Sequence, residues 1–249
     1  MGGSLAIVMA AGKGTRMESD LPKVLVPACG RPMIEYVLDS LEASGVTKSV
    51  VVVGYRADVV RETLAHRENI VYADQTEQLG TGHAVMMCRE QIDAHDGAVL
   101  VVTGDSPMIQ PSSVKALLDL YASDKPACIL GSSNSEDPTG LGRIVRNDAA
   151  EFIGIVEEKD ATDEQRKITE VNMSTYVFDA KLLGSTLDKL TNDNKQSEYY
   201  ITDCPGILRD EGQDVRALPV LQPCESLSVN NMAQLAIVEA EMRKMGMAK

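Results

Sequence analysis

A short glycine-rich segment near the start of the chain carries the residues best suited to phosphate chemistry. Gly12 and Gly14 follow an apolar run directly, and residues without a Cβ let backbone N–H groups approach a phosphate closely. Lys13, Arg16 and Lys23 add three cations over the same short stretch. The segment therefore predicts a binding site for a polyphosphate group.

Two familiar phosphate loops do not fit this segment. A P-loop requires GxxxxGK[ST], but here Lys13 precedes Gly14 and no glycine lies five residues before Gly12. A dinucleotide fingerprint needs a third glycine where the chain has Met17. The structural alternative is a plain strand-to-helix turn with solvated charges, and the spacing from Arg16 to a Leu-Pro-Lys tripeptide favours the phosphate site.

A second candidate site lies in the segment Gln-Thr-Glu-Gln-Leu-Gly-Thr-Gly-His-Ala, residues 75–84. Gly80 and Gly82 flank Thr81 just before a predicted helix, so backbone and hydroxyl groups are presented at a helix start. Gln75 offers an amide donor and an acceptor, as reading the edge of a pyrimidine requires. A helix cap with a glycine turn would explain Thr81 but not Gln75.

A candidate metal ligand ends the next strongly apolar run. Asp105 follows Thr103-Gly104, and polar groups at the carboxyl end of a parallel strand lie at the ligand-binding edge of the sheet. A carboxylate is a hard oxygen ligand suited to Mg²⁺. The alternative is an aspartate that caps a turn before Pro107.

The elements that must position these residues alternate between strand and helix. Continuous apolar runs predict buried strands, and the intervening segments have helical periodicity, which together indicate an α/β fold with a doubly wound, mostly parallel sheet of the Rossmann-like nucleotidyltransferase kind. Predicted strands are Leu5–Ala11, Ser49–Gly54, Ala98–Thr103 and Ala127–Gly131, and predicted helices are Met33–Ala43, Ala57–Ala65, Gly82–Ile92 and Ser113–Ala122.

From about residue 140 shorter strand-like pieces predict a smaller mixed β insertion that forms the far wall of a cleft. We expect a nucleotidyltransferase domain over residues 1–230 and a C-terminal helix over 231–249. The predicted strands here are Ile144–Val145, Phe152–Val156 and Val171–Phe178, and the predicted helices are Lys181–Thr191, Tyr199–Arg209 and Met232–Lys249.

Composition limits the possible partners. The formal net charge is −13, which disfavours nucleic acid and means that an anionic substrate must meet clustered cations, backbone N–H groups and a metal ion. No apolar run is long enough to span a membrane, and the first residues lack the pattern of a secretion signal. The five cysteines are scattered without metal-site or disulfide spacing. A cytoplasmic protein is expected.

Two motifs resemble known families. Ala-Ala-Gly12-x-Gly14-Thr-Arg16-Met followed by Pro22-Lys23 is similar to the signature of the sugar-nucleotide pyrophosphorylase superfamily. The QxxQLGTGHA segment resembles the N-acetylglucosamine-1-phosphate uridylyltransferase family, the pyrophosphorylase half of bacterial GlmU. The resemblance extends from Leu5 to about Ala240.

The resemblance implies roles for individual residues. The loop and Arg16 would hold the triphosphate, Lys23 would contact the transferred phosphate, and both would be catalytic; the metal would be Mg²⁺. The remaining implied contacts are Ala11, Gly12, Lys13 and Gly14 for the triphosphate, Gln75, Gly80 and Thr81 for uracil, Asp105 and Asn230 for the metal, and Gly142, Glu157, Asn172 and Thr202 for the sugar.

The sequence also departs from the family pattern. Ser174 stands where the family has glycine, Leu141 and Thr103 where tyrosine is usual, and Met232 where arginine follows the two asparagines. Three of these departures are expected near the sugar, so the identity of the acceptor stays open. The acetyltransferase β-helix of the bifunctional enzyme is not expected in this chain, nor is its activity.

The predicted function is a uridylyltransferase that joins UTP to a hexose-1-phosphate, with N-acetylglucosamine-1-phosphate preferred, and releases pyrophosphate. Transfer needs positioning and charge neutralisation rather than a protein nucleophile. One alternative is a UTP-dependent transferase for glucose-1-phosphate or another sugar-1-phosphate. The other is a non-catalytic nucleotide-sugar-binding regulatory protein. The oligomeric state is left open.

Overall fold

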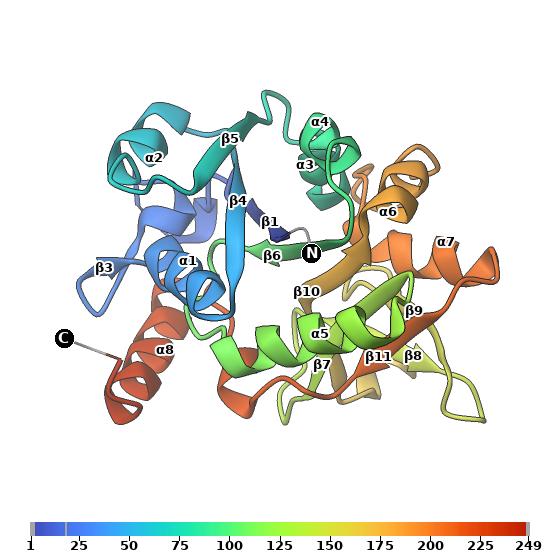
Figure 1. Ribbon diagram of the computed structural model, residues 1–249. Coiled ribbons are helices and arrows are strands. Elements are labelled where there is room, and N and C mark those ends of the chain that lie inside the picture. The colour runs from blue at the N-terminus through green and yellow to red at the C-terminus, as the bar shows by residue number, and fades with distance from the viewer. Residues whose placement is uncertain (1–2, 18, 248–249) are drawn as a thin grey trace.

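One large twisted sheet forms the centre of the computed structural model, which describes residues 3–17 and 19–247 (Figure 1). Its strands lie in the order β11-β7-β10-β6-β1-β4-β5, with β8 and β9 attached beside β10, and β2 and β3 form a separate hairpin. The strands are β1 Ser4–Met9, β2 Pro27–Ala28, β3 Arg31–Pro32, β4 Val46–Val53, β5 Ile70–Asp74, β6 Ala98–Thr103, β7 Cys128–Asn134, β8 Gly142–Arg146, β9 Phe152–Val156, β10 Glu170–Asp179 and β11 Val215–Leu218.

Helices cover both faces of this sheet. Side chains alternate along a strand, so Ile7 of β1 packs into the core on one face while Val8 packs into the core on the other. The first core includes residues of α3, α4, α6 and α7, and the second includes residues of α1, α2 and α5. The helices are α1 Met33–Ala43, α2 Ala57–Thr63, α3 Thr81–Met86, α4 Arg89–Asp93, α5 Pro111–Asp124, α6 Ala180–Leu187, α7 Cys204–Asp210 and α8 Met232–Lys244.

The predicted doubly wound, mostly parallel sheet is confirmed. β1 pairs in parallel with both β4 and β6, β4 pairs in parallel with β5, and β7 pairs in parallel with β11. The carboxyl ends of β1 and β6 therefore lie side by side, which brings the glycine-rich loop and Asp105 to one edge of the sheet.

The placement of β10 differs from the prediction. Its sequence was assigned to the insertion, yet residues Tyr176–Asp179 pair antiparallel with β6, and β7 pairs with β10 on the other side. Only the start of the strand belongs to the predicted wall, where Asn172 pairs with Gly142 of β8. Strand pairing of this kind depends on contacts distant in sequence, which a local apolar pattern does not contain.

Several predicted boundaries were also wrong. The helix expected over Gly82–Ile92 is two helices, α3 and α4, separated at Met87 and Cys88. The helix expected over Tyr199–Arg209 begins as a 3-10 turn, Ile201–Asp203, before α7. The edge strands β5 and β11 and the β2–β3 hairpin were not predicted, since each is short or only half-buried.

A third apolar cluster joins the C-terminal helix to the start of the chain. Leu235, Val238 and Met242 of α8 pack with Met17 and Met33. Glu239 of α8 also accepts a hydrogen bond from the backbone N–H of Cys29 in the β2–β3 turn, at 2.8 Å. The last residues of the predicted helix, 248–249, lie outside the described residues, and the domain boundary at residue 230 stays a prediction.

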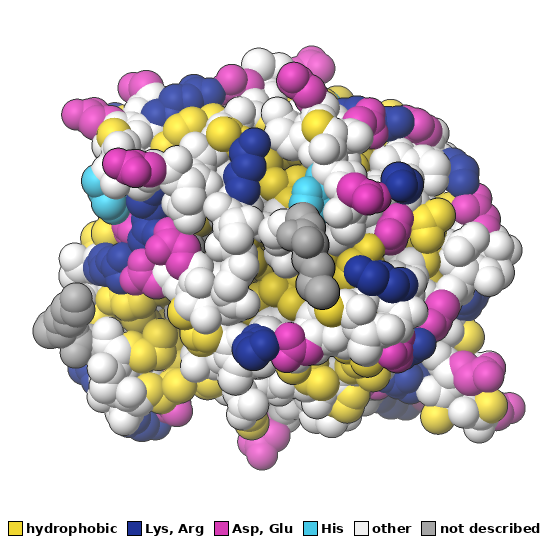
Figure 2. Space-filling view, in the orientation of Figure 1, with side chains coloured by type: hydrophobic (Ala, Val, Ile, Leu, Met, Phe, Trp, Pro, Cys, Tyr) yellow, Lys and Arg dark blue, Asp and Glu magenta, His cyan; other side chains and the backbone are white. Residues whose placement is uncertain are grey.

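Acidic side chains outnumber basic ones, 37 to 24, and many of the basic ones form ion pairs. On the face in Figure 2, dark blue Lys and Arg side chains lie mostly beside magenta Asp and Glu side chains. Among the described residues, no helix has the length and apolar character needed to cross a membrane.

Candidate active site

The glycine-rich loop is shaped by its contact with the segment that carries Lys23. Gly14 has φ +67°, and a Cβ at this position would lie 2.6 Å from the Cβ of Lys23. The carbonyl of Gly14 accepts the backbone N–H of Met17 at 2.9 Å, and the Met17 side chain is buried. A side chain at position 14 is thus excluded by both backbone conformation and space, and the loop lies directly against Lys23.

Two segments remote in sequence converge on the Lys23 ammonium. Its Nζ forms an ion pair with Oδ2 of Asp105 and donates a hydrogen bond to Oδ1 of Asn230 at 3.1 Å. Arg16 donates to the same Oδ1 at 3.4 Å. The structure therefore brings together both predicted catalytic cations and both predicted metal ligands.

The side-chain oxygens of Asp105 and Asn230 are suitable for a divalent cation. They already face one cation from two sides, and Mg²⁺ commonly takes one or two protein oxygens and fills the rest of its shell with phosphate and water. Across the part of the chain that the structure describes, no group of three or more His, Cys, Asp or Glu side chains offers another metal site. The residues present therefore fit a magnesium ion shared with bound phosphates.

Asn230 is held by neighbours that the sequence reasoning missed. Its backbone N–H donates to Oε1 of Gln234 at 2.8 Å, and its Nδ2 donates to Oγ of Ser228 at 3.2 Å. Asn231 caps α8 by accepting the N–H of Gln234 at 2.9 Å. A Gln four residues after the first Asn of a helix-starting pair is the sequence signal that could have found this arrangement.

A cavity of about 300 Å³ lies between the glycine-rich loop and the 75–84 segment. All three residues predicted for the nucleotide base line it, together with others that were not assigned to the base. The lining residues are Met9, Ala11, Gly12, Gln75, Gln78, Gly80, Thr81, Ala84, Thr103, Asp105 and Glu198.

The amide of Gln75 has a defined orientation in this cavity. Its Nε2 lies 3.0 Å from the carbonyl oxygen of Gly80 and 3.1 Å from Nδ1 of His83, and the side chain is only 4% exposed. Both N–H groups therefore have protein partners, and Oε1 is left as a hydrogen-bond acceptor. This differs from the prediction that Gln75 presents donor and acceptor alike, and it gives His83 a role as partner to Gln75.

Gly80 and Thr81 act differently from each other. Gly80 has φ +106°, and a Cβ there would lie 2.5 Å from the carbonyl oxygen of Tyr199, so only glycine fits. The Thr81 hydroxyl accepts the backbone N–H of Ile201 at 3.1 Å. Gln78, which was not assigned, donates to the carbonyl of Ala11 at 2.8 Å and joins the cavity wall to the phosphate loop.

Lys13, predicted to hold the triphosphate, lies against an aromatic ring. Its Nζ is 5.2 Å from the centre of the Tyr55 ring, on the side of a neighbouring cavity of about 290 Å³ that Gln75 and Gln78 also line. This position is a cation–π contact.

The predicted sugar residues lie on the far wall, in hydrogen-bonded pairs. Thr202 donates to Oε1 of Glu157 at 3.0 Å, and Asn172 donates to the hydroxyl of Tyr176 at 2.6 Å. Gly142 pairs with Asn172, and a Cβ on Gly142 would lie 3.2 Å from Cγ2 of Ile155 and 3.5 Å from Cβ of Asn172, so a side chain there would press against both.

Burial controls the ionisation of this wall. The pKa of Glu157 is raised from its ordinary value, mainly because the carboxylate is removed from water, and the carboxylates of Asp203, Asp160 and Glu198 add to the effect. The hydrogen bond from Thr202 acts in the opposite direction. Burial likewise raises the pKa of Asp203. The same strands also carry ion pairs, from Arg143 to Glu158 and from Arg146 to Glu170, each at 2.7 Å, so Glu157 stands out as a carboxylate whose partner is a hydroxyl.

The departures from the family pattern have structural settings. Ser174 has φ +51°, in the left-handed region that favours glycine. Thr103 lies in the cavity with Gln75 and hydrogen-bonds Ser106 at 2.7 Å. Leu141 lines a separate groove of about 790 Å³ together with Gln234 and Ile237 of α8.

A glycine-rich loop, clustered cations and two side-chain oxygens meet at the carboxyl edge of the parallel sheet. This combination of fold and site is typical of a nucleotidyltransferase. A family model described as the MobA-like NTP transferase domain matches residues 6–194, and the chain belongs to this family.

Relatives with curated names are the bifunctional proteins GlmU. The chain is 46% identical over 239 residues to GlmU of Streptococcus pyogenes serotype M1, and 45% identical over 239 residues to GlmU of serotype M28 (strain MGAS6180). Each match covers 96% of this chain and 52% of the relative, so the chain spans about half the length of these proteins. The resemblance predicted from the motifs is confirmed.

Two solved structures share the fold. A Bacillus anthracis protein assigned as a glucose-1-phosphate thymidylyltransferase, in complex with sucrose, superposes with a TM-score of 0.79 at 18% identity, covering 96% of this chain and 95% of that one. An apo UDP-glucose pyrophosphorylase gives a TM-score of 0.79 at 17% identity and covers 99% of this chain and 100% of that one. At these identities the likeness shows the fold alone.

Proposed function

We propose that the chain transfers a uridylyl group from UTP to a hexose-1-phosphate, preferably N-acetylglucosamine-1-phosphate, with Mg²⁺. A phosphate oxygen of the sugar phosphate attacks the α-phosphorus of UTP, the bond from that phosphorus to the bridging oxygen breaks, and pyrophosphate leaves. The observation that carries this proposal is the convergence of Arg16, Lys23, Asp105 and Asn230 beside the cavity of Gln75.

The chain's own residues supply positioning and positive charge. Arg16 and Lys23 bind the phosphates and stabilise the charge that builds up during transfer, and the narrow loop around Gly14 holds Lys23 in place. A magnesium ion held by Asp105 and Asn230 would neutralise the phosphate oxygens and orient them. Lys13, beside Tyr55, would reach the outer part of the triphosphate.

The Gln75 amide supports uracil as the base. Uracil carries a donor, N3–H, on its pairing edge, whereas cytosine carries an acceptor at the same atom. Because the N–H groups of Gln75 face Gly80 and His83, its Oε1 suits the uracil donor and is unsuited to cytosine. The names of the GlmU relatives, at 46% identity, are consistent with this assignment.

Glucose-1-phosphate is the second candidate acceptor. Ser174 and Leu141, which depart from the family pattern, are close in sequence to the proposed sugar residues Asn172 and Gly142, although Leu141 lines the separate groove beside α8. A glucose-1-phosphate uridylyltransferase would use the same residues for UTP and the metal ion as the first candidate.

Pyrophosphate release from a panel of substrates tests both candidates. Sugar-1-phosphates are combined with UTP, CTP, ATP or dTTP in the presence of Mg²⁺, and the ratio kcat/KM is compared. The proposal expects UTP with N-acetylglucosamine-1-phosphate to be fastest. Faster turnover with glucose-1-phosphate would establish the second candidate, and no pyrophosphate from any pair would favour a regulatory protein that binds without turnover.

A further inference from the structure

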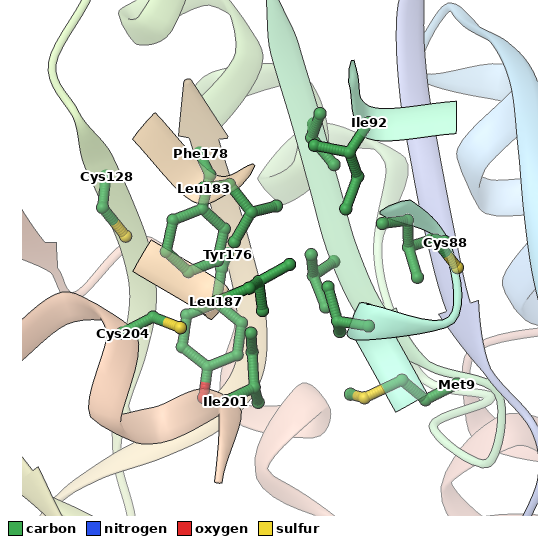
Figure 3. Close-up of a cluster of buried hydrophobic side chains, with 14 of the residues drawn as sticks. Met9, Cys88, Ile92, Cys128, Tyr176, Phe178, Leu183, Leu187, Ile201 and Cys204 are labelled. Carbon is green, nitrogen blue, oxygen red and sulfur yellow. The ribbon is translucent and has the colours of Figure 1, made fainter. Parts of the chain in front are cut away.

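A buried tyrosine hydroxyl holds the amide of Asn172 from within the hydrophobic core. Tyr176 is 0% exposed, and its hydroxyl accepts a hydrogen bond from Nδ2 of Asn172 at 2.6 Å. Figure 3 shows the Tyr176 ring among Leu187, Ile201 and Cys204, with the hydroxyl at the end that points away from Phe178. A polar atom in such a setting needs a partner, and Asn172 provides it.

A bulge in β10 makes this contact possible. In a regular strand, residues four apart are separated by about 13 Å, too far for two side chains of this size to meet. Here Asn172 lies opposite Ser132 while Tyr176 lies opposite Leu130, so four residues of β10 cover the length of only two on β7. The side chains of Asn172 and Tyr176 therefore lie on the same face of β10, next to each other.

The bulge also fixes the other end of the amide. Ser174, at φ +51°, directs its backbone N–H to Oδ1 of Asn172 at 3.3 Å. The Asn172 amide is thus held at both its nitrogen and its oxygen, and the side chain is 4% exposed. One N–H and one lone pair of the amide remain beyond these two contacts, on the strand position that pairs with Gly142 of β8.

Tyr176 itself is firmly positioned. Its backbone pairs with Val101 on β6 and with Leu130 on β7, and its ring lies 5.7 Å from the ring of Phe178. The hydroxyl cannot move far without disturbing the centre of the main sheet. A rigid partner of this kind keeps the hydrogen-bonding atoms of Asn172 in one orientation.

We propose that Tyr176 is a positioning residue for the acceptor sugar: its hydroxyl orients the Asn172 amide, which in turn contacts the sugar of the sugar-1-phosphate. The proposal rests on the proposed function and extends it to a residue in the core that touches no substrate. Binding of the sugar-1-phosphate then depends on the Tyr176 hydroxyl, whereas binding of UTP does not.

A double-mutant cycle tests this role. Tyr176→Phe is expected to raise KM for the sugar-1-phosphate roughly tenfold while KM for UTP changes less than about twofold. Asn172→Ala is expected to raise the acceptor KM at least as much, and the double variant should be no worse than Asn172→Ala alone, since the tyrosine acts through the asparagine. Fully additive effects, or equal changes for both substrates, would overturn the proposal.

Tyr121→Phe is the matched control. Tyr121 is also buried, and its hydroxyl donates to Oδ2 of Asp179 at 2.8 Å on the other face of the sheet. The loss of this hydroxyl is expected to affect thermal stability but neither KM. If Tyr121→Phe raised the acceptor KM as much as Tyr176→Phe, both effects would come from a general loss of structural order. That result would contradict the proposal.

A measurement on the unaltered protein covers the case in which Tyr176→Phe does not fold. In ¹⁵N spectra the side-chain amide protons of Asn172 should exchange with water at least roughly tenfold more slowly than those of the exposed Asn192. Equal exchange would contradict the held amide. If instead Asn172→Ala leaves the acceptor KM unchanged while the amide is protected, the assignment of the sugar wall fails and the tyrosine contact stands.

Discussion

The proposed donor side and the proposed acceptor side of the site are built from different interactions. On the donor side, Arg16 and Lys23 come from two 3-10 turns and Asp105 and Asn230 from loops, and they are joined by an ion pair and charge-assisted hydrogen bonds. On the acceptor side, Asn172 pairs with a tyrosine hydroxyl and Glu157 with a threonine hydroxyl on antiparallel strands or beside them.

This difference matches the chemistry of the two proposed ligands. A triphosphate needs positive charge, and charge acts over several ångströms with loose geometry. A sugar needs hydrogen bonds at fixed positions, and these depend on orientation. Loss of a donor-side charge should therefore reduce the rate of turnover. Loss of an acceptor-side group should mainly weaken the binding of the sugar-1-phosphate.

The strongest test of the comparison is Asp105→Ala. We expect turnover to fall by about two to three orders of magnitude, with the fold intact by circular dichroism, because a preorganised group at developing charge is lost. Pyrophosphate release at saturating substrates measures the effect, and Lys23→Ala should behave similarly. Asp119→Ala, which breaks an exposed ion pair with Lys115, is the control and should change nothing. An Asp105→Ala enzyme near the normal rate would exclude the metal assignment.

Gly80→Ala tests the close contact between the 75–84 segment and the backbone of Tyr199. The new Cβ meets the carbonyl of Tyr199 and the residue needs φ +106°, so we expect a loss of about 2–3 kcal/mol in the free energy of unfolding and a rise of at least roughly tenfold in KM for UTP. Gly206→Ala, in α7 with open space around it, is the control and should be neutral or slightly stabilising. Equal behaviour of the two variants would show that the 75–84 turn is not constrained.

Glu157→Gln separates stability from binding on the acceptor wall. The raised pKa means that the folded protein holds a proton more tightly than the unfolded chain, so the stability linked to Glu157 is present below pH 4.5 and is lost as pH rises through the folded-state pKa. Glutamine does not ionise, so Glu157→Gln does not lose this stability as pH rises. Its stability relative to the unaltered protein should increase from pH 4.5 to neutrality in urea titrations.

The same variant should bind the acceptor worse. Replacing the carboxylate weakens a charge-assisted hydrogen bond to a sugar hydroxyl, and KM for the sugar-1-phosphate should rise roughly tenfold with kcat little changed. A stability difference independent of pH would show that Glu157 is not desolvated in the folded state.

Ser174→Gly should have the smallest effect. Glycine adopts φ +51° without a steric cost, so we expect a gain of about 0.5–1 kcal/mol in the free energy of unfolding, measured by thermal denaturation, with KM for both substrates unchanged. A large change in acceptor preference would mean that the serine hydroxyl acts on the sugar site, either directly or through the Tyr176 hydroxyl beside it.

The donor side could be predicted from the sequence far better than the acceptor side. The apolar run of β1, the glycines that follow it and Asp105 after β6 are local signals, and parallel strands necessarily bring their ends together. Gln234 and His83 were missed because their roles are side-chain contacts with Asn230 and Gln75 that no spacing specifies.

The acceptor side depends on pairing between distant segments. The antiparallel insertion of β10 between β6 and β7 and its bulge at Ser174 decide where Asn172 points, and neither follows from an apolar pattern. Glu157 was assigned from the family resemblance, since its sequence alone suggests a charged loop.

The course of β10 limits how this protein can be re-engineered. One end of the strand carries Asn172 on the acceptor wall, and the other end, from Tyr176, is part of the main sheet. The wall is therefore not a separable module: a graft from another transferase that replaced only β8 and β9 would leave the recipient's own Asn172 in place. Exchange of acceptor specificity between relatives requires moving β10 together with its core partners.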